Sequence, residues 1–116
     1  MEEKLISYET AKLAKEKAFD WKCRFLYKFE QLGWEEGLGV DYNWNCFDSY
    51  SCPTQSLLQK WLREVHKIII VVDFEVQVRK YYYKIYSGIS ILEALYYNTY
   101  EECLEEALQS SLNKIK

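Results

Sequence analysis

The sequence predicts an α+β fold in which residues 1–116 form a single domain. We expect one antiparallel sheet of four to five strands, with two to three helices packed mainly on one face, in the order α-β-β-α-β-β-β-α. Two observations lead to this prediction. In residues 53–72 the apolar side chains first recur at helical spacing and then change, without a break, to the β-branched run of a buried strand. Elsewhere, segments of helical period alternate with segments of strand period, and 116 residues suffice for one hydrophobic core.

The N-terminal part predicts a short helix followed by a hairpin. The helix is expected to begin after Ser7, because serine is a common helix cap. Residues 22–29 then alternate between apolar and polar side chains, as residues 40–46 do, and three of the four glycines lie between the two runs. We therefore expect residues 22–29 and 40–46 to pair as an antiparallel hairpin with a long loop. Residues 48–52 are expected to form a second loop.

The central helix is expected to begin at Pro53 and Thr54. Trp61 lies in the middle of its apolar stripe, so we predict that this side chain is buried against the sheet. The strand pattern that follows runs from residue 68 to residue 86 without a glycine, proline or asparagine. We place its turn between Glu75 and Arg79.

The C-terminal part predicts one more strand and the clearest helix of the chain. Ser87 and Gly88 mark a turn, and residues 89–96 resume the strand pattern. Thr99 and Glu102 then form a capping box, in which each residue satisfies a backbone N–H of the other. A helix is therefore expected from residue 99 to the end of the chain.

Net charge and hydropathy argue against several classes of protein for this chain. The net charge of −3 argues against a surface built as a whole for nucleic acid, because neutralising phosphates requires concentrated lysine and arginine. No apolar run approaches the roughly 20 residues that span a bilayer. The chain opens with acidic residues and shows no secretion signal, so we expect a cytoplasmic protein that does not bind membranes and has reduced cysteines.

Four cysteines and one histidine invite a metal-site interpretation, but their spacing does not support one. Cys46 and Cys52 are six residues apart, and the close ligand pairs of structural zinc sites are missing from the sequence. Cys52 is expected to be the most accessible thiol. His66 ends the central helix, where a cation interacts favourably with the helix dipole. We therefore predict no metal, no cofactor and no catalytic residue, and hence no enzyme.

Basic and aromatic residues supply an alternative function, the binding of single-stranded nucleic acid. If two basic strand segments adjoin on one open sheet, they would combine cations with rings on which bases can stack. The other interpretation is that these side chains only solvate an exposed sheet face. The candidate residues are Lys22, Arg24, Lys28, Arg79, Lys80, Tyr82 and Lys84.

A surplus of apolar surface predicts self-association. The face of Ile69 and Val71, the tyrosines 81–83, and Tyr96 and Tyr97 supply more apolar surface than a few short helices cover. A homodimer would cover this surplus, either face to face or by pairing of an exposed strand edge. In the alternative, residues 33–50 fold over the surface and leave a monomer. The excess of tyrosine and tryptophan, which interfaces favour, makes a protein-interaction module the main functional expectation.

Three segments of the chain together carry a family resemblance. They are SYETAKL at residues 7–13, PTQ at 53–55 with QKWLREVH at 59–66, and YNTYEE at 97–102 with LEEAL at 104–108. In this combination the chain resembles a family of small uncharacterised proteins of phages and prophages of anaerobic gut bacteria. The resemblance implies an accessory protein made in the bacterial host cytoplasm, with an unknown phage or host protein as partner. It implies no activity, cofactor or site residue, and Ala18 stands where a glycine would be expected after the first helix.

Overall fold

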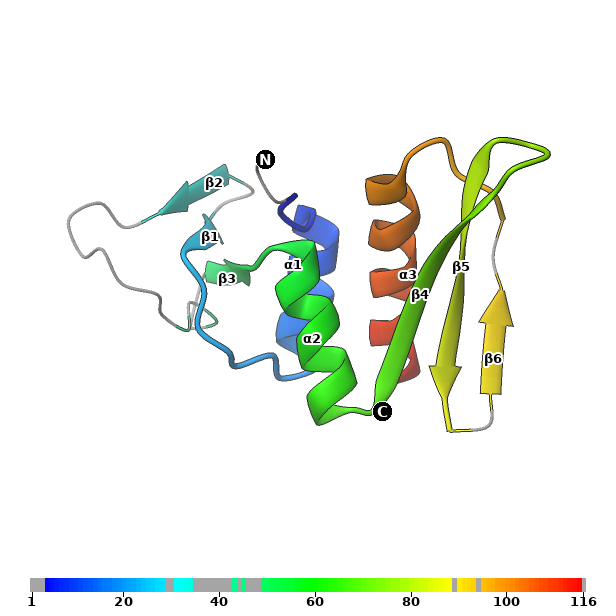
Figure 1. Ribbon diagram of the computed structural model, residues 1–116. Helices are drawn as coiled ribbons and strands as arrows, with labels where there is room; N and C mark the ends of the chain where they lie inside the picture. The colour runs from blue at the N-terminus through cyan, green and yellow to red at the C-terminus, as the bar shows by residue number, and fades with distance from the viewer. Residues whose placement is uncertain are drawn as a thin grey trace.

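Two separate antiparallel sheets lie on opposite sides of a layer of helices (Figure 1). This computed structural model describes residues 4–28, 31–34, 43, 45, 49–88, 90–93 and 95–115, and for residues 31–34 and 90–93 only the backbone. The expected α+β class is confirmed. The expected single sheet of four to five strands is wrong, because the helices lie between two sheets and pack against both of them.

Each helix of the described chain begins at a side-chain cap. The side chains of Ser7, Thr54 and Thr99 accept hydrogen bonds from the backbone N–H groups three residues further on. Such a cap stabilises a helix by about 1 kcal/mol, so these residues fix where the helices start. All three predicted starts are confirmed. The helices are α1 (Tyr8–Glu16), α2 (Gln55–Val65) and α3 (Tyr100–Lys114).

The first sheet consists of β1 (Phe25–Lys28), β2 (Gln31–Trp34) and β3 (Ser49–Cys52) in the order β2-β1-β3. The prediction of a loop at 48–52 is wrong, since residues 49–52 pair with β1. The error has a physical cause: Ser49 and Ser51 are buried, and buried serines show no hydrophobic period. The predicted partner strand at 40–46 lies outside the described residues except for Asn43 and Asn45. β1 pairs with β2 and β3 instead.

The second sheet consists of β4 (Ile68–Glu75), β5 (Lys80–Ser87) and β6 (Ser90–Glu93) in the order β4-β5-β6. The predicted turn between β4 and β5 is confirmed, because Arg79 donates its backbone N–H to the Glu75 carbonyl at 2.8 Å. The last predicted strand is shorter than residues 89–96. Beyond β6, Tyr97 continues the pairing as a single bridge to Tyr81.

The hydrophobic core lies between the helices and the second sheet. Trp61 is 1% exposed, so its predicted burial is confirmed. Its ring meets that of Phe19 edge to face, with 5.2 Å between the ring centroids. Leucines of α2 and α3 and isoleucines of the second sheet complete the cluster: Leu58, Leu62, Leu104, Leu108, Leu112, Ile68, Ile70 and Ile85.

Candidate functional site

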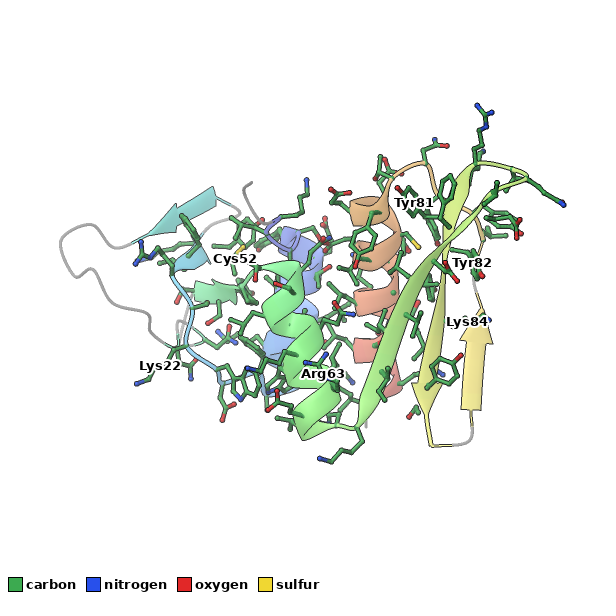
Figure 2. All side chains as sticks on the ribbon, in the orientation of Figure 1. Lys22, Cys52, Arg63, Tyr81, Tyr82 and Lys84 are labelled. Carbon is green, nitrogen blue, oxygen red and sulfur yellow. The ribbon has the colours of Figure 1, made fainter. Side chains whose placement is uncertain are left out.

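The seven residues of the candidate nucleic-acid face lie on different sheets. Lys22, Arg24 and Lys28 belong to β1 and the segment before it, whereas the other four belong to β5 and the turn before it. Figure 2 shows Lys22 and Lys84 at opposite ends of the molecule, with the helices between them. The condition that both basic segments adjoin on one open sheet is therefore not met.

Acidic residues accompany the cations of β5. Glu75 lies opposite Lys80 in the strand register, and Asp73 lies opposite Tyr82. The Tyr82 hydroxyl donates to Asp73 Oδ2 at 3.4 Å, and Lys84 Nζ lies 5.9 Å from the centre of the Tyr82 ring. Partial desolvation and the neighbouring Asp73 raise the pKa of Tyr82. Because Asp73 and Glu75 offset the positive charges of Lys80 and Lys84, the second sheet is a poor surface for phosphates.

The face of the second sheet that points away from the helices is a candidate interaction surface of the described chain. Along β4, Ile68 and Ile70 are buried, whereas the alternating Ile69 and Val71 are 46% and 41% exposed. The helices cover only the opposite face (Figure 1). We call this surface the outer face and define it by Ile69, Val71, Asp73 and Glu75 of β4 and Lys80, Tyr82, Lys84 and Tyr86 of β5.

Only part of the expected tyrosine cluster belongs to the outer face. Tyr83 is 4% exposed on the helix side, where its hydroxyl lies 3.0 Å from the Ser110 hydroxyl. Tyr97 stacks on the ring of Tyr83 and is not on the outer face either. Tyr82 does lie there, with its ring 6.1 Å from that of Tyr96. The run 81–83 is therefore divided between the two faces of the sheet, because side chains alternate along a strand.

Side chains cap the open edge of β4. Gln59 of α2 donates from Nε2 to the Ile70 carbonyl at 3.1 Å. Asp73 Oδ1 accepts the backbone N–H of Phe74 at 2.8 Å. Strand pairing needs these backbone groups, so the two caps act against adding a further strand at this edge.

The cysteines of the described chain are buried thiols that form no disulfide with one another. The expectation that Cys52 is accessible is wrong: it is 0% exposed, and its Sγ lies 3.5 Å from the Ile6 carbonyl. Burial raises the pKa of Cys52 to about 12 and that of Cys103 to about 11. A thiol with such a pKa is a poor nucleophile at neutral pH. Cys46 lies outside the described residues.

Metal ligands do not gather in the part of the chain that the structure describes, where no group of three or more His, Cys, Asp or Glu side chains is arranged to hold an ion. His66 follows the last turn of α2, as expected. Its ring packs on that of Trp61 with 4.7 Å between the centroids, so it also contributes to the edge of the core.

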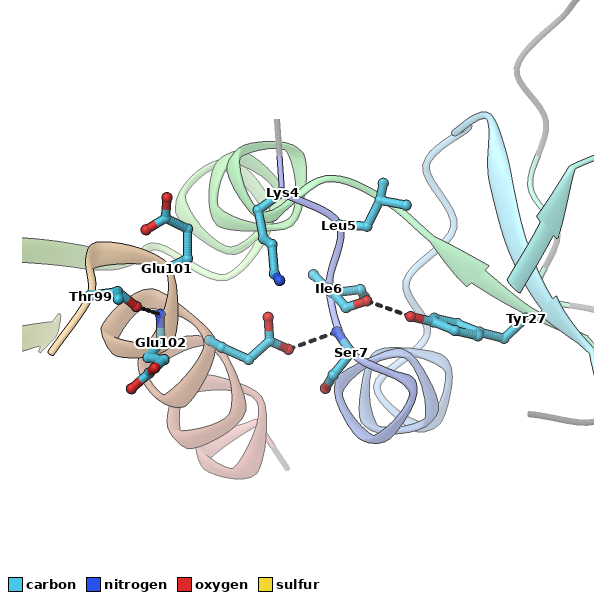
Figure 3. A pocket seen from close by; sticks show the side chains of 9 residues that line it. Lys4, Leu5, Ile6, Ser7, Tyr27, Thr99, Glu101 and Glu102 are labelled. Carbon is cyan, nitrogen blue, oxygen red and sulfur yellow. Dashed lines mark hydrogen bonds between the residues drawn. The ribbon is translucent and has the colours of Figure 1, made fainter. Parts of the chain in front are cut away.

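A cleft of about 780 Å³ lies between the N-terminal ends of α1 and α3, and Glu105 is one of the residues that line it (Figure 3). Glu105 Oε2 accepts hydrogen bonds from the Ser7 backbone N–H at 2.9 Å and from the Thr10 hydroxyl, and Oε1 accepts from Gln55 Nε2 at 2.9 Å. Glu105 is therefore bonded to residues of α1 and α2 and is not only a solvated side chain of α3. Its carboxylate holds three helices together, which suits a structural role better than a catalytic one.

Comparisons with known proteins find no match: no family model, no curated protein and no solved structure is similar to the chain. The resemblance to phage proteins thus stays a prediction. None of the helices in the described segments combines the length and apolar character needed to cross a membrane.

Proposed function

We propose that this protein is a non-enzymatic interaction module that binds a protein through its outer face, as a phage-type accessory protein in the bacterial cytoplasm. One observation carries the proposal: Ile69 and Val71 are half exposed on a sheet face that the described helices leave uncovered. Contiguous apolar surface of this kind marks interaction sites on soluble proteins.

The composition of the outer face supports a protein partner. Tyr82 and Tyr86 add aromatic rings with polar tips to the aliphatic side chains of β4. Such rings are enriched at protein interfaces, where they bury apolar area and still satisfy a hydroxyl. By contrast, the polar groups around Glu105 in the cleft are hydrogen-bonded to one another, which argues against catalysis there.

The competing function is single-stranded nucleic-acid binding by the basic residues of the two sheets. A single-stranded nucleic acid that contacts both Lys22 and Lys84 would have to pass around the helix layer. Acids beside the cations of β5 further weaken this alternative.

A matched pair of variants tests the proposal. Val71→Lys introduces a cation on the outer face, and Val65→Lys makes the same change at a residue of α2 that is similarly exposed, 49% against 41%. Tagged wild-type protein and both variants would be expressed in bacteria together with an untagged copy of the chain, and captured proteins would be quantified by mass spectrometry. We expect at least one protein, the untagged copy included, to be captured by wild type and Val65→Lys and lost with Val71→Lys.

Two results would overturn the proposal. The first is a set of captured proteins that is the same for wild type and Val71→Lys. The second is binding of an oligonucleotide that weakens steeply with salt and strengthens in Val71→Lys, because an added cation favours phosphates. Circular dichroism of both variants would show that each is folded.

A further inference from the structure

The two strands of the outer face carry opposite charges. The outward residues of β4 are Ile69, Val71 and the acids Asp73 and Glu75, whereas those of β5 include the bases Lys80 and Lys84. The strand register places one outward residue of each strand in every row. The rows are Ile69 with Tyr86, Val71 with Lys84, Asp73 with Tyr82, and Glu75 with Lys80. The outer face is therefore apolar at one end and charged at the other.

This pattern is complementary to itself under one rotation. In this arrangement two outer faces are in contact, and the two-fold axis lies between β4 and β5 and runs parallel to them. Each row then contacts the same row of the second copy, and β4 of one copy lies over β5 of the other. Glu75 then faces Lys80 of the second copy, and Ile69 faces its Tyr86. Opposite charges therefore meet at one end of the interface and apolar groups at the other, whereas in a row between them Val71 faces Lys84 of the second copy.

Other two-fold arrangements of the same two faces are less favourable. An axis perpendicular to the strands reverses their direction and places Ile69 against Glu75, so an apolar group would desolvate a carboxylate. An axis centred on β5 places Lys80 and Lys84 against their own copies. The charge pattern therefore selects the arrangement in which β4 lies over β5 of the second copy.

We propose that the outer face binds a second copy of this chain, face to face, with β4 of each copy over β5 of the other. The inference rests on the proposed function and names its partner. The capped edge of β4 supports this mode over a continuous sheet, because the Ile70 carbonyl and the Phe74 N–H already have side-chain partners.

The size of the face predicts a weak dimer. An eight-residue strand is about 27 Å long, and the two overlapping strands are about 10 Å wide, which gives on the order of 260 Å² of contact area per copy. Stable interfaces bury about 800 Å² per partner. We therefore expect dissociation in the range of tens of micromolar, and a mass that rises with concentration.

A charge-exchange experiment separates this dimer from other associations. Glu75→Lys and Lys80→Glu each place like charges against each other in their homodimers. In the mixed dimer, the lysine introduced at position 75 of the first variant faces the glutamate introduced at position 80 of the second. The unchanged Lys80 of the first variant faces the unchanged Glu75 of the second, so both intermolecular pairs are restored. The neighbouring charges within each chain stay alike, so recovery on mixing reports intermolecular contacts only.

Sedimentation equilibrium of the wild type, each variant and their mixture supplies the measurement. We expect the wild type and the mixture to dimerise. Each variant alone should have a dissociation constant about tenfold higher, because its homodimer loses two exposed ion pairs. Val71→Lys should be monomeric and Val65→Lys dimeric.

Either of two outcomes would overturn the dimer. One is a monomer mass for the wild type at about 200 µM, well above the expected dissociation constant. The other is a mixture that dimerises no better than its components. If a different protein is still captured through Val71, the interaction module stands without self-association.

Discussion

Glu105 of α3 accepts a hydrogen bond at 2.9 Å from the backbone N–H of Ser7, the residue that caps α1, 98 positions earlier in the chain. The same carboxylate binds Gln55 in the first turn of α2. A single side chain thus joins the starts of three helices that the sequence separates widely. Because α2 and α3 pack against the second sheet, the contact also helps to position the outer face.

Removing this carboxylate should destabilise the protein. Glu105→Ala removes an acceptor from the Ser7 N–H, the Thr10 hydroxyl and the Gln55 amide in a partly buried site, and Gln55 Nε2 keeps only the Glu101 carbonyl. We expect a loss of about 2 to 3 kcal/mol in the free energy of unfolding, measured with urea. The control, Glu106→Ala, changes an exposed residue on the same helix and should cost less than about 0.5 kcal/mol. Equal losses in both variants would contradict the role of Glu105.

Replacing Ala18 with glycine should stabilise the protein. Its φ of 66° lies in the left-handed region, where an L residue with a Cβ is strained and glycine is not. Ala18→Gly should raise the free energy of unfolding by up to about 1 kcal/mol, whereas Ala14→Gly, inside α1 and fully buried, should lower it by at least about 1 kcal/mol. A lower thermal midpoint for Ala18→Gly would contradict the prediction.

The sequence predicts those parts of the fold that depend on neighbouring residues. The caps at Ser7, Thr54 and Thr99 and the apolar stripe around Trp61 are local patterns, and all of them are confirmed. β3 was missed because its buried serines lack an apolar period. The role of Glu105 could not be predicted from the sequence, because its partners on α1 and α2 lie at least 50 positions away.

The division into two sheets was missed for a related reason. A strand pattern shows which residues alternate, but not which strands pair or on which side of the helices they lie. The candidate basic residues illustrate this limit, since Lys22 and Lys84 proved to lie on opposite sides of the helix layer. The sequence does predict the surplus apolar surface of Ile69 and Val71, and both residues are exposed because side chains alternate along β4 and separate them from Ile68 and Ile70.

The rings of Trp61 should contribute more to the stability of the fold than its indole nitrogen does. Trp61→Ala removes the largest buried side chain and should cost about 3 to 5 kcal/mol, most of the stability of a domain of this size. The buried Nε1 has no hydrogen-bond partner among the described residues, so Trp61→Phe removes an unsatisfied donor together with part of the ring. We therefore expect Trp61→Phe to cost less than half as much as Trp61→Ala in urea unfolding. Similar losses for the two variants would show that the nitrogen contributes to stability.

Alkaline pH should destabilise the fold through its buried thiols. The pKa of Cys52 is raised to about 12 and that of Cys103 to about 11, above the usual value near 9, because burial disfavours the thiolate. The unfolded chain therefore loses these protons first as the pH rises. Both thiols contribute their full stability below about pH 9 and lose it progressively up to their raised pKa values, at about 1.4 kcal/mol per pH unit for each group.

Urea unfolding between pH 7 and pH 11 tests this prediction. Cys103→Ala removes one titrating thiol, so the free energy of unfolding should fall less steeply with pH than in the wild type above pH 9. The difference in slope should approach one proton, because the folded state keeps the Cys103 proton that the unfolded state loses. Parallel curves for the two proteins over this range would mean that Cys103 titrates alike in both states, and that its burial does not oppose ionisation.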